Sequence, residues 1–273
     1  MSDTWLNDAS TDGVNNSTLV LIKPVGLSHW PTIKKIILKT APISRTRLVK
    51  VTDALIQQHY DEHKERGWFS QLVKYFVGQY VLAVEISADP NKIRKIIGTT
   101  KPTDNANSNT IRGLISSLTP SDTTMTEYTK GIDNLIHGAD SEEAAAREIE
   151  LWFESPPPPS PKLLCLTNHK LELEGAVSPF VGINFDLTDG NTLASHVTDL
   201  LEAMPWNSYW LKAGNSIPKI VVGGLTPVSI LGLQYLTTHT GQTAEVAWIN
   251  PKTGTMQSVD LQIVKNRARR HRK

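Results

Sequence analysis

Long apolar runs and paired cysteines are both missing from this chain of 273 residues. No apolar stretch is long enough to cross a bilayer, so we expect no membrane-spanning segment. The start, Met1-Ser2-Asp3-Thr4-Trp5, has no basic residue ahead of an apolar core, which predicts that no secretory signal is present. The single cysteine, Cys165, cannot form an internal disulfide, and this favours a reducing, cytoplasmic location.

A large excess of charge is also missing over the chain as a whole. With 28 basic and 27 acidic side chains, the formal net charge is +1, which gives no overall attraction to nucleic acid. The exception is a basic tail, residues 265–273, which carries six Lys and Arg residues. Such a tail either attracts nucleic acid or phosphate, or is a solvated terminus. No aromatic residue lies between its basic ones, which favours the second interpretation.

Proline divides the chain into two halves. Residues 155–161 read Ser-Pro-Pro-Pro-Pro-Ser-Pro, and consecutive prolines lock φ and favour an extended stretch. We interpret this segment as a semi-rigid linker between domains, with a surface loop inside one domain as the alternative. The predicted organisation is a flexible N-terminus (1–17), a first domain (18–154), the linker (155–161), a second domain (162–264) and the basic tail.

The first domain shows an alternation of strand and helix patterns. Strands are predicted at 18–22, 48–51 and 80–86, and helices at 31–38, 53–60, 69–76, 90–97 and 141–153. Asp53 and Ser141 are the expected caps of their helices. This order indicates an α+β fold in which helices pack on an antiparallel sheet.

One motif in this domain suggests chemistry. His137 stands just before a capped helix, in the segment Asn134 to Ser141, and Glu148 lies further along that helix. A lone histidine is more often structural than catalytic, so the motif needs support from its surroundings.

Residues 18–153 resemble the nucleoside diphosphate kinase family. The resemblance rests on separated motifs in the family's order: Lys23-Pro24-Val25-Gly26; His59-Tyr60 with Lys64 and Arg66-Gly67-Trp68-Phe69; Gly98-Thr99-Thr100-Lys101-Pro102; Thr110-Ile111-Arg112-Gly113; Asn134 to Ser141; and Glu148 to Phe153. It covers about half of the chain and implies a ferredoxin-like βαββαβ core.

The resemblance also implies an activity, in which a nucleoside triphosphate donates its γ-phosphoryl group to a nucleoside diphosphate. His137 would form a phosphohistidine, Glu148 would orient its ring, and Tyr60 would lie beside it. The other implied residues would bind nucleotide: Lys23, Arg94, Arg112 and Thr100 at phosphate, Asn134 at the ribose and Trp68 at the base. Mg²⁺ would enter bound to the nucleotide phosphates, and a homo-oligomer is expected. Taken singly, most of these side chains have an ordinary structural interpretation; together they favour nucleotide binding.

The chain departs from the family pattern at four places. Val25 replaces an aspartate, Ala139 replaces a serine beside the histidine, and Asp133 stands where an arginine often precedes the asparagine. The region between Arg112 and Asn134 is also longer than the family usually keeps. A long loop there is more often functional or mobile than neutral. The resemblance therefore does not by itself imply the usual hexamer or full catalytic speed.

The second domain is predicted to be a small Rossmann-like α/β unit. Strands are expected at 163–166, 181–187, 219–222 and 244–249, with helices at 192–203 and 228–236. Between a strand and a helix lies a turn that contains Gly223, Gly224, Thr226 and Ser229. A Gly-rich turn that opens a helix can bind phosphate through backbone N–H groups, or can be an ordinary tight turn.

This region weakly resembles one lobe of the CARF/SAVED sensor domains, which recognise cyclic oligonucleotide messengers in antiviral defence. The sequence thus leaves two functions open. The leading one is a nucleoside diphosphate kinase-like phosphotransferase with a regulatory or localising second domain. The alternative is a nucleotide-binding signalling or defence protein whose second domain senses a cyclic oligonucleotide.

Overall fold

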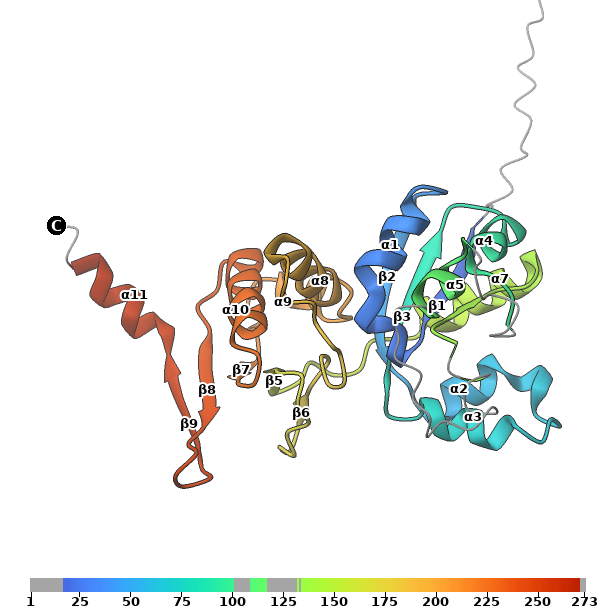
Figure 1. Ribbon diagram of the computed structural model, residues 1–273. Coiled ribbons are helices and arrows are strands. Elements are labelled where there is room, and N and C mark those ends of the chain that lie inside the picture. The colour runs from blue at the N-terminus through green and yellow to red at the C-terminus, as the bar shows by residue number, and fades with distance from the viewer. Residues whose placement is uncertain (1–16, 101–108, 117–131, 133, 271–273) are drawn as a thin grey trace, which may run out of the picture.

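The N-terminal half of the molecule is built on a four-stranded antiparallel sheet. The computed structural model describes residues 17–100, 109–116, 132 and 134–270, and Figure 1 draws the whole arrangement. The strands are β1 (Thr18–Ile22), β2 (Ile43–Lys50), β3 (Tyr80–Ile86) and β4 (Ile136–Gly138). Their order, β2-β3-β1-β4 with antiparallel neighbours, is that of a ferredoxin-like fold, as predicted.

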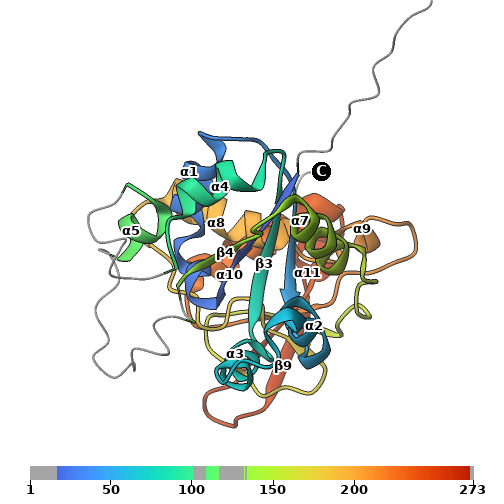
Figure 2. The ribbon, with the colours of Figure 1, turned by 90° about the vertical axis from the view of Figure 1, so that its right-hand side faces the viewer.

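Helices cover both faces of this sheet because its inner strands are apolar on both sides. All five residues of β1 are buried, and successive side chains point to opposite faces. Val20 and Ile22 pack in one core cluster, whereas Leu19 and Leu21 pack in another. The first cluster includes residues of α1 (Trp30–Leu38), α4 (Pro90–Ile97) and α5 (Ile111–Ser116); the second includes residues of α2 (Asp53–His59), α3 (Phe69–Phe76) and the segment after α7 (Glu142–Ile149). Figure 2 shows α2, α3 and α7 on the side that faces the viewer.

Some boundaries in this half differ from the expected ones, most clearly at β2 and α2. Strand β2 begins at Ile43, because its polar first half pairs with β3 although it shows no apolar pattern. Thr52, and not Asp53, caps α2: its hydroxyl accepts a hydrogen bond from the N–H of Leu55 at 3.2 Å. Ser141 caps α7 as expected, and the chain then continues through a π-helical turn, η4 (Glu150–Glu154).

The C-terminal half contains a second sheet, of five strands in the order β6-β5-β7-β8-β9. The strands are β5 (Leu163–Leu166), β6 (Ala176–Val177), β7 (Lys219–Val222), β8 (Glu245–Ile249) and β9 (Met256–Asp260), and the helices are α8 (Gly190–Glu202), α9 (Asn207–Trp210), α10 (Thr226–Thr240) and α11 (Leu261–Arg270). The first four strands are parallel and β9 is antiparallel. Strands β5 and β7 have the expected bounds, 163–166 and 219–222.

The expected strand over 181–187 is wrong. Gly182 has φ +78°, which is incompatible with an extended strand, and the backbone N–H of Asn184 donates to the hydroxyl of Ser28 at 2.9 Å instead of to a neighbouring strand. Ile183 and Phe185 are buried all the same. The apolar alternation of this segment therefore reflects burial of an irregular loop against the other half.

The two halves meet through α8, which packs on α1 and on the edge strand β2. Asp199 accepts hydrogen bonds from Trp30 Nε1 at 3.0 Å and from Lys34 Nζ at 2.7 Å. His196 Nε2 donates to the carbonyl oxygen of Leu27 at 2.8 Å, and the N–H of Leu48 donates to the carbonyl of residue 203 at 2.7 Å. One apolar core cluster includes residues of both halves.

Several predicted features fall partly or wholly outside the described residues. These are the flexible start (1–16), positions 101 and 102 of one motif, most of the long region before Asn134, and the last three residues of the basic tail. The rest of that tail, up to Arg270, belongs to α11, a helix that buries none of its residues and lies at one end of the molecule in Figure 1. Among the described residues, every helix is too short or too polar to span a membrane.

Candidate active site

His137 lies on the edge strand β4, opposite Leu21 of β1. Two residues before it, Leu135 has φ +71°, the left-handed region that non-glycine residues rarely occupy. The carbonyl oxygen of Leu135 accepts a hydrogen bond from the backbone N–H of Lys23 at 2.9 Å. A Cβ atom on Gly26 would lie 2.3 Å from that same oxygen. The glycine of the Lys23–Gly26 motif is thus required by a close approach to the histidine strand.

The ring of His137 is paired with a buried carboxylate. Its Nε2 lies 3.1 Å from Oε2 of Glu148, which is 4% exposed on α7. Burial lowers the pKa of His137 to about 3, and the nearby cations Lys23 and Arg112 act in the same direction. Burial raises the pKa of the Glu148 carboxyl. At neutral pH the imidazole is therefore neutral, and Glu148 accepts the Nε2 proton in a hydrogen bond, leaving a lone pair on Nδ1.

Lys23 is buried beside this pair, directly after β1. Its ammonium donates to the carbonyl oxygen of Ile132 at 2.5 Å and to Oδ1 of Asn134 at 2.7 Å, and it lies 5.8 Å from the centre of the Phe76 ring. The structure thus brings Lys23 and Asn134 together.

Two arginines add positive charge at the same place. Arg112 is 7% exposed and donates to the carbonyl oxygens of Gly98 at 2.8 Å and Ile136 at 2.7 Å. Burial and the neighbouring charge of Arg94 lower its pKa to about 10. Arg94 itself is exposed on α4, and its Cγ lies 4.0 Å from where a Cβ of Gly138 would be. Both arginines contribute to the low pKa of His137, so the structure places them around it.

The aromatic residues of the predicted site form a connected group. The ring of Tyr60 is buried 6.0 Å from that of His137, and burial raises the pKa of its hydroxyl. The ring of His63 packs near both Tyr60 and Trp68. Its centre lies 6.3 Å from that of Tyr60 and 5.3 Å from that of Trp68. Trp68 is half-buried, and Thr100 is exposed beyond the end of α4.

The sequence prediction missed His59 as a site residue. Its ring lies 4.8 Å from that of His137 at an angle of 82°, and it is 1% exposed. The Nε1–H of Trp152 donates to its Nδ1 at 3.2 Å. His59 was recognised only as part of a family motif; its position next to Tyr60 was the available signal.

The model of the nucleoside diphosphate kinase family matches residues 16–157. The chain belongs to the nucleoside diphosphate kinase family. It is 35% identical over 145 residues to a nucleoside diphosphate kinase of Exiguobacterium sibiricum; the aligned region covers 51% of this chain and 96% of that protein. It is 37% identical over 142 residues to one of Mycolicibacterium vanbaalenii, covering 50% and 95%. A crystal structure of the Aquifex aeolicus nucleoside diphosphate kinase is 24% identical, with a TM-score of 0.43 and coverage of 51% and 96%.

Membership of this family confirms the prediction of a kinase-type enzyme. All the kinase-site residues named above lie within the matched range, whereas the second half of the chain lies outside it. The roles of the individual residues stay predictions that the geometry can support but that the family match does not test.

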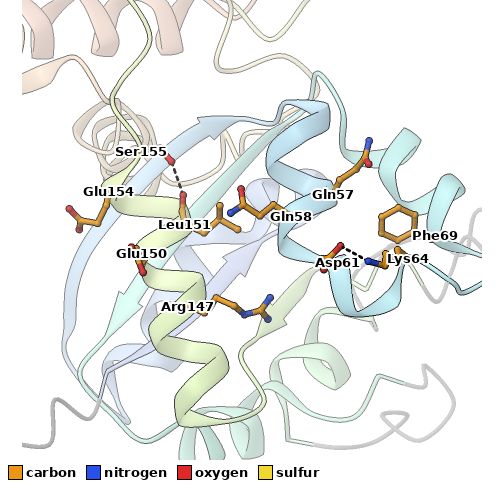
Figure 3. A pocket seen from close by; sticks show the side chains of 10 residues that line it. All are labelled: Gln57, Gln58, Asp61, Lys64, Phe69, Arg147, Glu150, Leu151, Glu154 and Ser155. Atoms are coloured by element: carbon orange, nitrogen blue, oxygen red, sulfur yellow. Dashed lines mark hydrogen bonds and ion pairs between the residues drawn. The ribbon is translucent and has the colours of Figure 1, made fainter.

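A cavity of about 790 Å³ lies between α2 and the α7–η4 segment, away from these residues. Figure 3 shows Arg147 extending from α7 toward the α2 side of this cavity. The lining contains no predicted site residue; it consists of Gln57, Gln58, Asp61, Lys64, Phe69, Arg147, Glu150, Leu151, Glu154 and Ser155. Arg147 connects the two regions, because its guanidinium also lies 4.0 Å from Oε1 of Glu148.

The predicted second ligand site lies at the start of α10. Ser229 is buried, and its hydroxyl donates to the carbonyl of Leu166 at 2.6 Å. Gly224 has φ +64°, and a Cβ there would lie 2.7 Å from the Thr167 hydroxyl. These contacts account for the serine and the glycine through packing of the turn on β5; a ligand role for Gly223, Gly224, Thr226 and Ser229 stays a prediction.

Proposed function

We propose that this chain transfers the γ-phosphoryl group of a nucleoside triphosphate to a nucleoside diphosphate through a phosphohistidine at His137. The observation that carries the proposal is the pairing of a neutral imidazole with a buried carboxylate. Because Glu148 accepts the Nε2 proton, the lone pair of Nδ1 is free to attack phosphorus. A covalent intermediate of this kind divides one difficult transfer into two easier ones.

The transfer takes place in two half-reactions. Nδ1 of His137 forms a bond to the γ-phosphorus while the bond from that phosphorus to the bridging oxygen breaks, and the nucleoside diphosphate leaves. A terminal oxygen of the second diphosphate then attacks the phosphorus, and the P–N bond breaks. The imidazole becomes more positive when it carries the phosphoryl group, and the nearby Glu148 carboxylate stabilises that charge.

The cations around His137 suit the charge of the group that is transferred. The pKa of His137 is lowered in part by three cations, Lys23, Arg94 and Arg112. Each of them therefore also acts on a charged group that is bound at His137. Phosphoryl transfer depends largely on positioning and on neutralising the phosphate oxygens. We assign these three side chains to the phosphates.

The remaining residues suit the other parts of a nucleotide. Trp68 offers a half-buried aromatic face for the base, and stacking accepts any base. Asn134, already bonded to Lys23, is assigned to the ribose, and Thr100 to a phosphate. Tyr60 is assigned to the wall beside the nucleophile.

Mg²⁺ would be bound mainly by the nucleotide phosphates. In the part of the chain that the structure describes, the one group of three possible metal ligands is His59, His137 and Glu148, which offers two nitrogens and one carboxylate. Mg²⁺ prefers oxygen ligands in an octahedral arrangement, so this group does not fit it. Bound Mg²⁺ would supply charge neutralisation at the phosphates.

The test is the intact mass of the protein after incubation with ATP and Mg²⁺, followed by a chase with GDP. We expect an acid-labile gain of one phosphoryl group that GDP removes. His137→Ala should abolish the gain, and His169→Ala, which changes an exposed histidine of the C-terminal half, should leave it unchanged. Bound nucleotide without any gain in mass would refute the proposal.

No observation favours the cyclic-oligonucleotide sensor over this function. The homo-oligomer, the nucleic-acid role of the basic tail and the Rossmann-like classification of the second half stay predictions. The contacts of α8 with α1 and β2 fit a second domain that stabilises or regulates the first.

A further inference from the structure

His59 is a buried side chain to which the proposed function gives no role. It is the last residue of α2, it is 1% exposed, and its ring packs at right angles against the ring of His137. A polar group in direct contact with the nucleophile influences where that nucleophile lies and how it is charged.

Trp152 fixes the tautomer of His59. An indole N–H can only donate, so Nδ1 of His59, 3.2 Å away, must present its lone pair. Burial lowers the pKa of His59 to about 3, so the ring is neutral and carries a single proton at neutral pH. That proton is therefore on Nε2.

The Nε2–H group is a buried donor that has no hydrogen-bond partner among the described residues. Leaving such a donor unsatisfied is unfavourable, and native proteins contain few of them. One ligand-type atom each of His59, His137 and Glu148 lies within 4.8 Å of the other two, and His59 lowers the pKa of the Glu148 carboxyl. The ring that carries this donor therefore lies beside the reacting pair.

Two imidazoles and a carboxylate at this spacing also resemble a transition-metal site. A metal on Nε2 of His59 would move the proton to Nδ1, where it would face the indole N–H of Trp152. Two donors would then oppose each other in a buried place, which is unfavourable. The Trp152 contact therefore favours a donor role for His59 over a ligand role.

We propose that His59 is a positioning residue. Its ring packs against His137, and its Nε2–H, set by Trp152, acts through space on the His137–Glu148 pair and keeps it in the geometry that phosphoryl transfer needs. The proposal rests on the proposed function of His137. By lowering the pKa of the Glu148 carboxyl, the neutral His59 ring helps to keep the shared proton on the imidazole, and it adds no charge next to the phosphoryl group.

Three variants separate the donor from the bulk of the side chain. His59→Phe keeps an aromatic ring without a donor, His59→Gln keeps a neutral donor, and Trp152→Phe keeps an aromatic ring at that place but releases the tautomer. Trp210→Phe is the matched control, because it removes an indole hydrogen bond of 2.9 Å, to Ser160, in the other half.

The first readout is the rate of His137 phosphorylation by ATP in a single turnover, together with the dissociation constant of the nucleotide. We expect His59→Phe and Trp152→Phe to phosphorylate about tenfold more slowly or worse, with unchanged nucleotide binding. His59→Gln should stay within about threefold of the parent, and Trp210→Phe should match it. Equal rates for His59→Phe and the parent protein would overturn the proposal.

The second readout is the pH profile of that rate. The groups that act on the Glu148 carboxyl are His59 on α2, its partner His137 on β4, Tyr60, and Arg147 and Asp140 on or beside α7. Loss of the His59 donor raises the pKa of Glu148, so the acid limb of His59→Phe should move to higher pH. A packing defect alone would lower the rate equally at every pH, and that result would contradict a positioning role.

The third readout begins with the parent protein. The ¹⁵N chemical shifts of the ring of His59 in the parent protein report its tautomer directly. We expect the Nε2–H form in the parent and a mixture of forms in Trp152→Phe. An Nδ1–H form, or stoichiometric Zn²⁺ binding that His59→Phe abolishes, would overturn the proposal. If the parent protein never becomes phosphorylated, the proposed function fails, whereas the tautomer still tests the role of His59.

Discussion

Gly26→Ala is the substitution that most directly tests how the fold holds the histidine strand. Gly26 lies in η1 (Pro24–His29), between Lys23 and the helix that the C-terminal half contacts. An added Cβ would lie 2.3 Å from the carbonyl oxygen of Leu135 and 3.0 Å from Cγ2 of Ile22. The nearer atom belongs to the backbone, so it cannot rotate away.

The size of the effect follows from these distances. Real Cβ atoms keep at least about 3.0 Å from such neighbours, so the two backbone segments must separate by about 0.7 Å. Overpacking of this kind costs about 1–3 kcal/mol of unfolding free energy. Because Leu135 already has a left-handed backbone two residues before His137, the shift reaches the nucleophile. A displacement approaching 1 Å in a catalytic group costs roughly tenfold to a hundredfold in rate.

Urea unfolding and single-turnover phosphorylation measure the two effects. Gly190→Ala is the matched control: it lies at the start of α8 with no atom within 4 Å of the added Cβ, and we expect its stability to be unchanged or to rise by up to about 1 kcal/mol. If Gly26→Ala unfolds within about 0.5 kcal/mol of the parent and phosphorylates at the parental rate, the proposed link between η1 and the histidine strand is wrong.

Three further predictions concern stability. Asp199→Ala removes the acceptor of Trp30 and Lys34 at the contact between the halves, and we expect urea unfolding to show a loss of about 1–3 kcal/mol; no loss would mean that this contact contributes nothing. Ser141→Ala removes the cap of the helix that carries Glu148 and should cost about 1 kcal/mol, with Ser195→Ala on α8, which caps no helix, as a control. Burial lowers the pKa of His196 to about 4, below its unfolded value near 6.5. The contribution of the neutral His196 ring to the free energy of unfolding is therefore complete above pH 6.5 and is lost as the pH falls toward 4. His196→Gln should therefore reduce the slope of stability against pH in that window by up to about 1.4 kcal/mol per unit, and an unchanged slope would show that His196 titrates normally.

Much of the kinase half could be predicted because its signals are local. The strand at Thr18–Ile22, the helix ending at Gly98 and the Ser141 cap all follow from patterns within a few residues. The motif around His137 could also be recognised from the sequence. Glu148 lies 11 residues after His137, on the helix that Ser141 caps. The missed features are those with weak local patterns, such as the polar first half of β2, which is a strand because β3 pairs with it.

The His59–Trp152 contact could not be predicted from the sequence, because it joins residues 93 positions apart. Nothing near His59 in the chain indicates which of its nitrogens carries the proton. Only the packing of the η4 segment against α2 brings the indole to Nδ1. The same holds for the contact between Gly26 and Leu135, where the motif shows a glycine but not the carbonyl that requires it.

The sequence by itself determined the family, the alternation of strands and helices and the set of residues that could handle phosphate, since these depend on residue type and spacing. The tertiary structure decided the protonation of His137, the tautomer of His59 and the docking of the second half on α1 and β2. Those properties depend on burial and on long-range contacts: desolvation lowers the pKa of an imidazole only after the fold has removed water from around it.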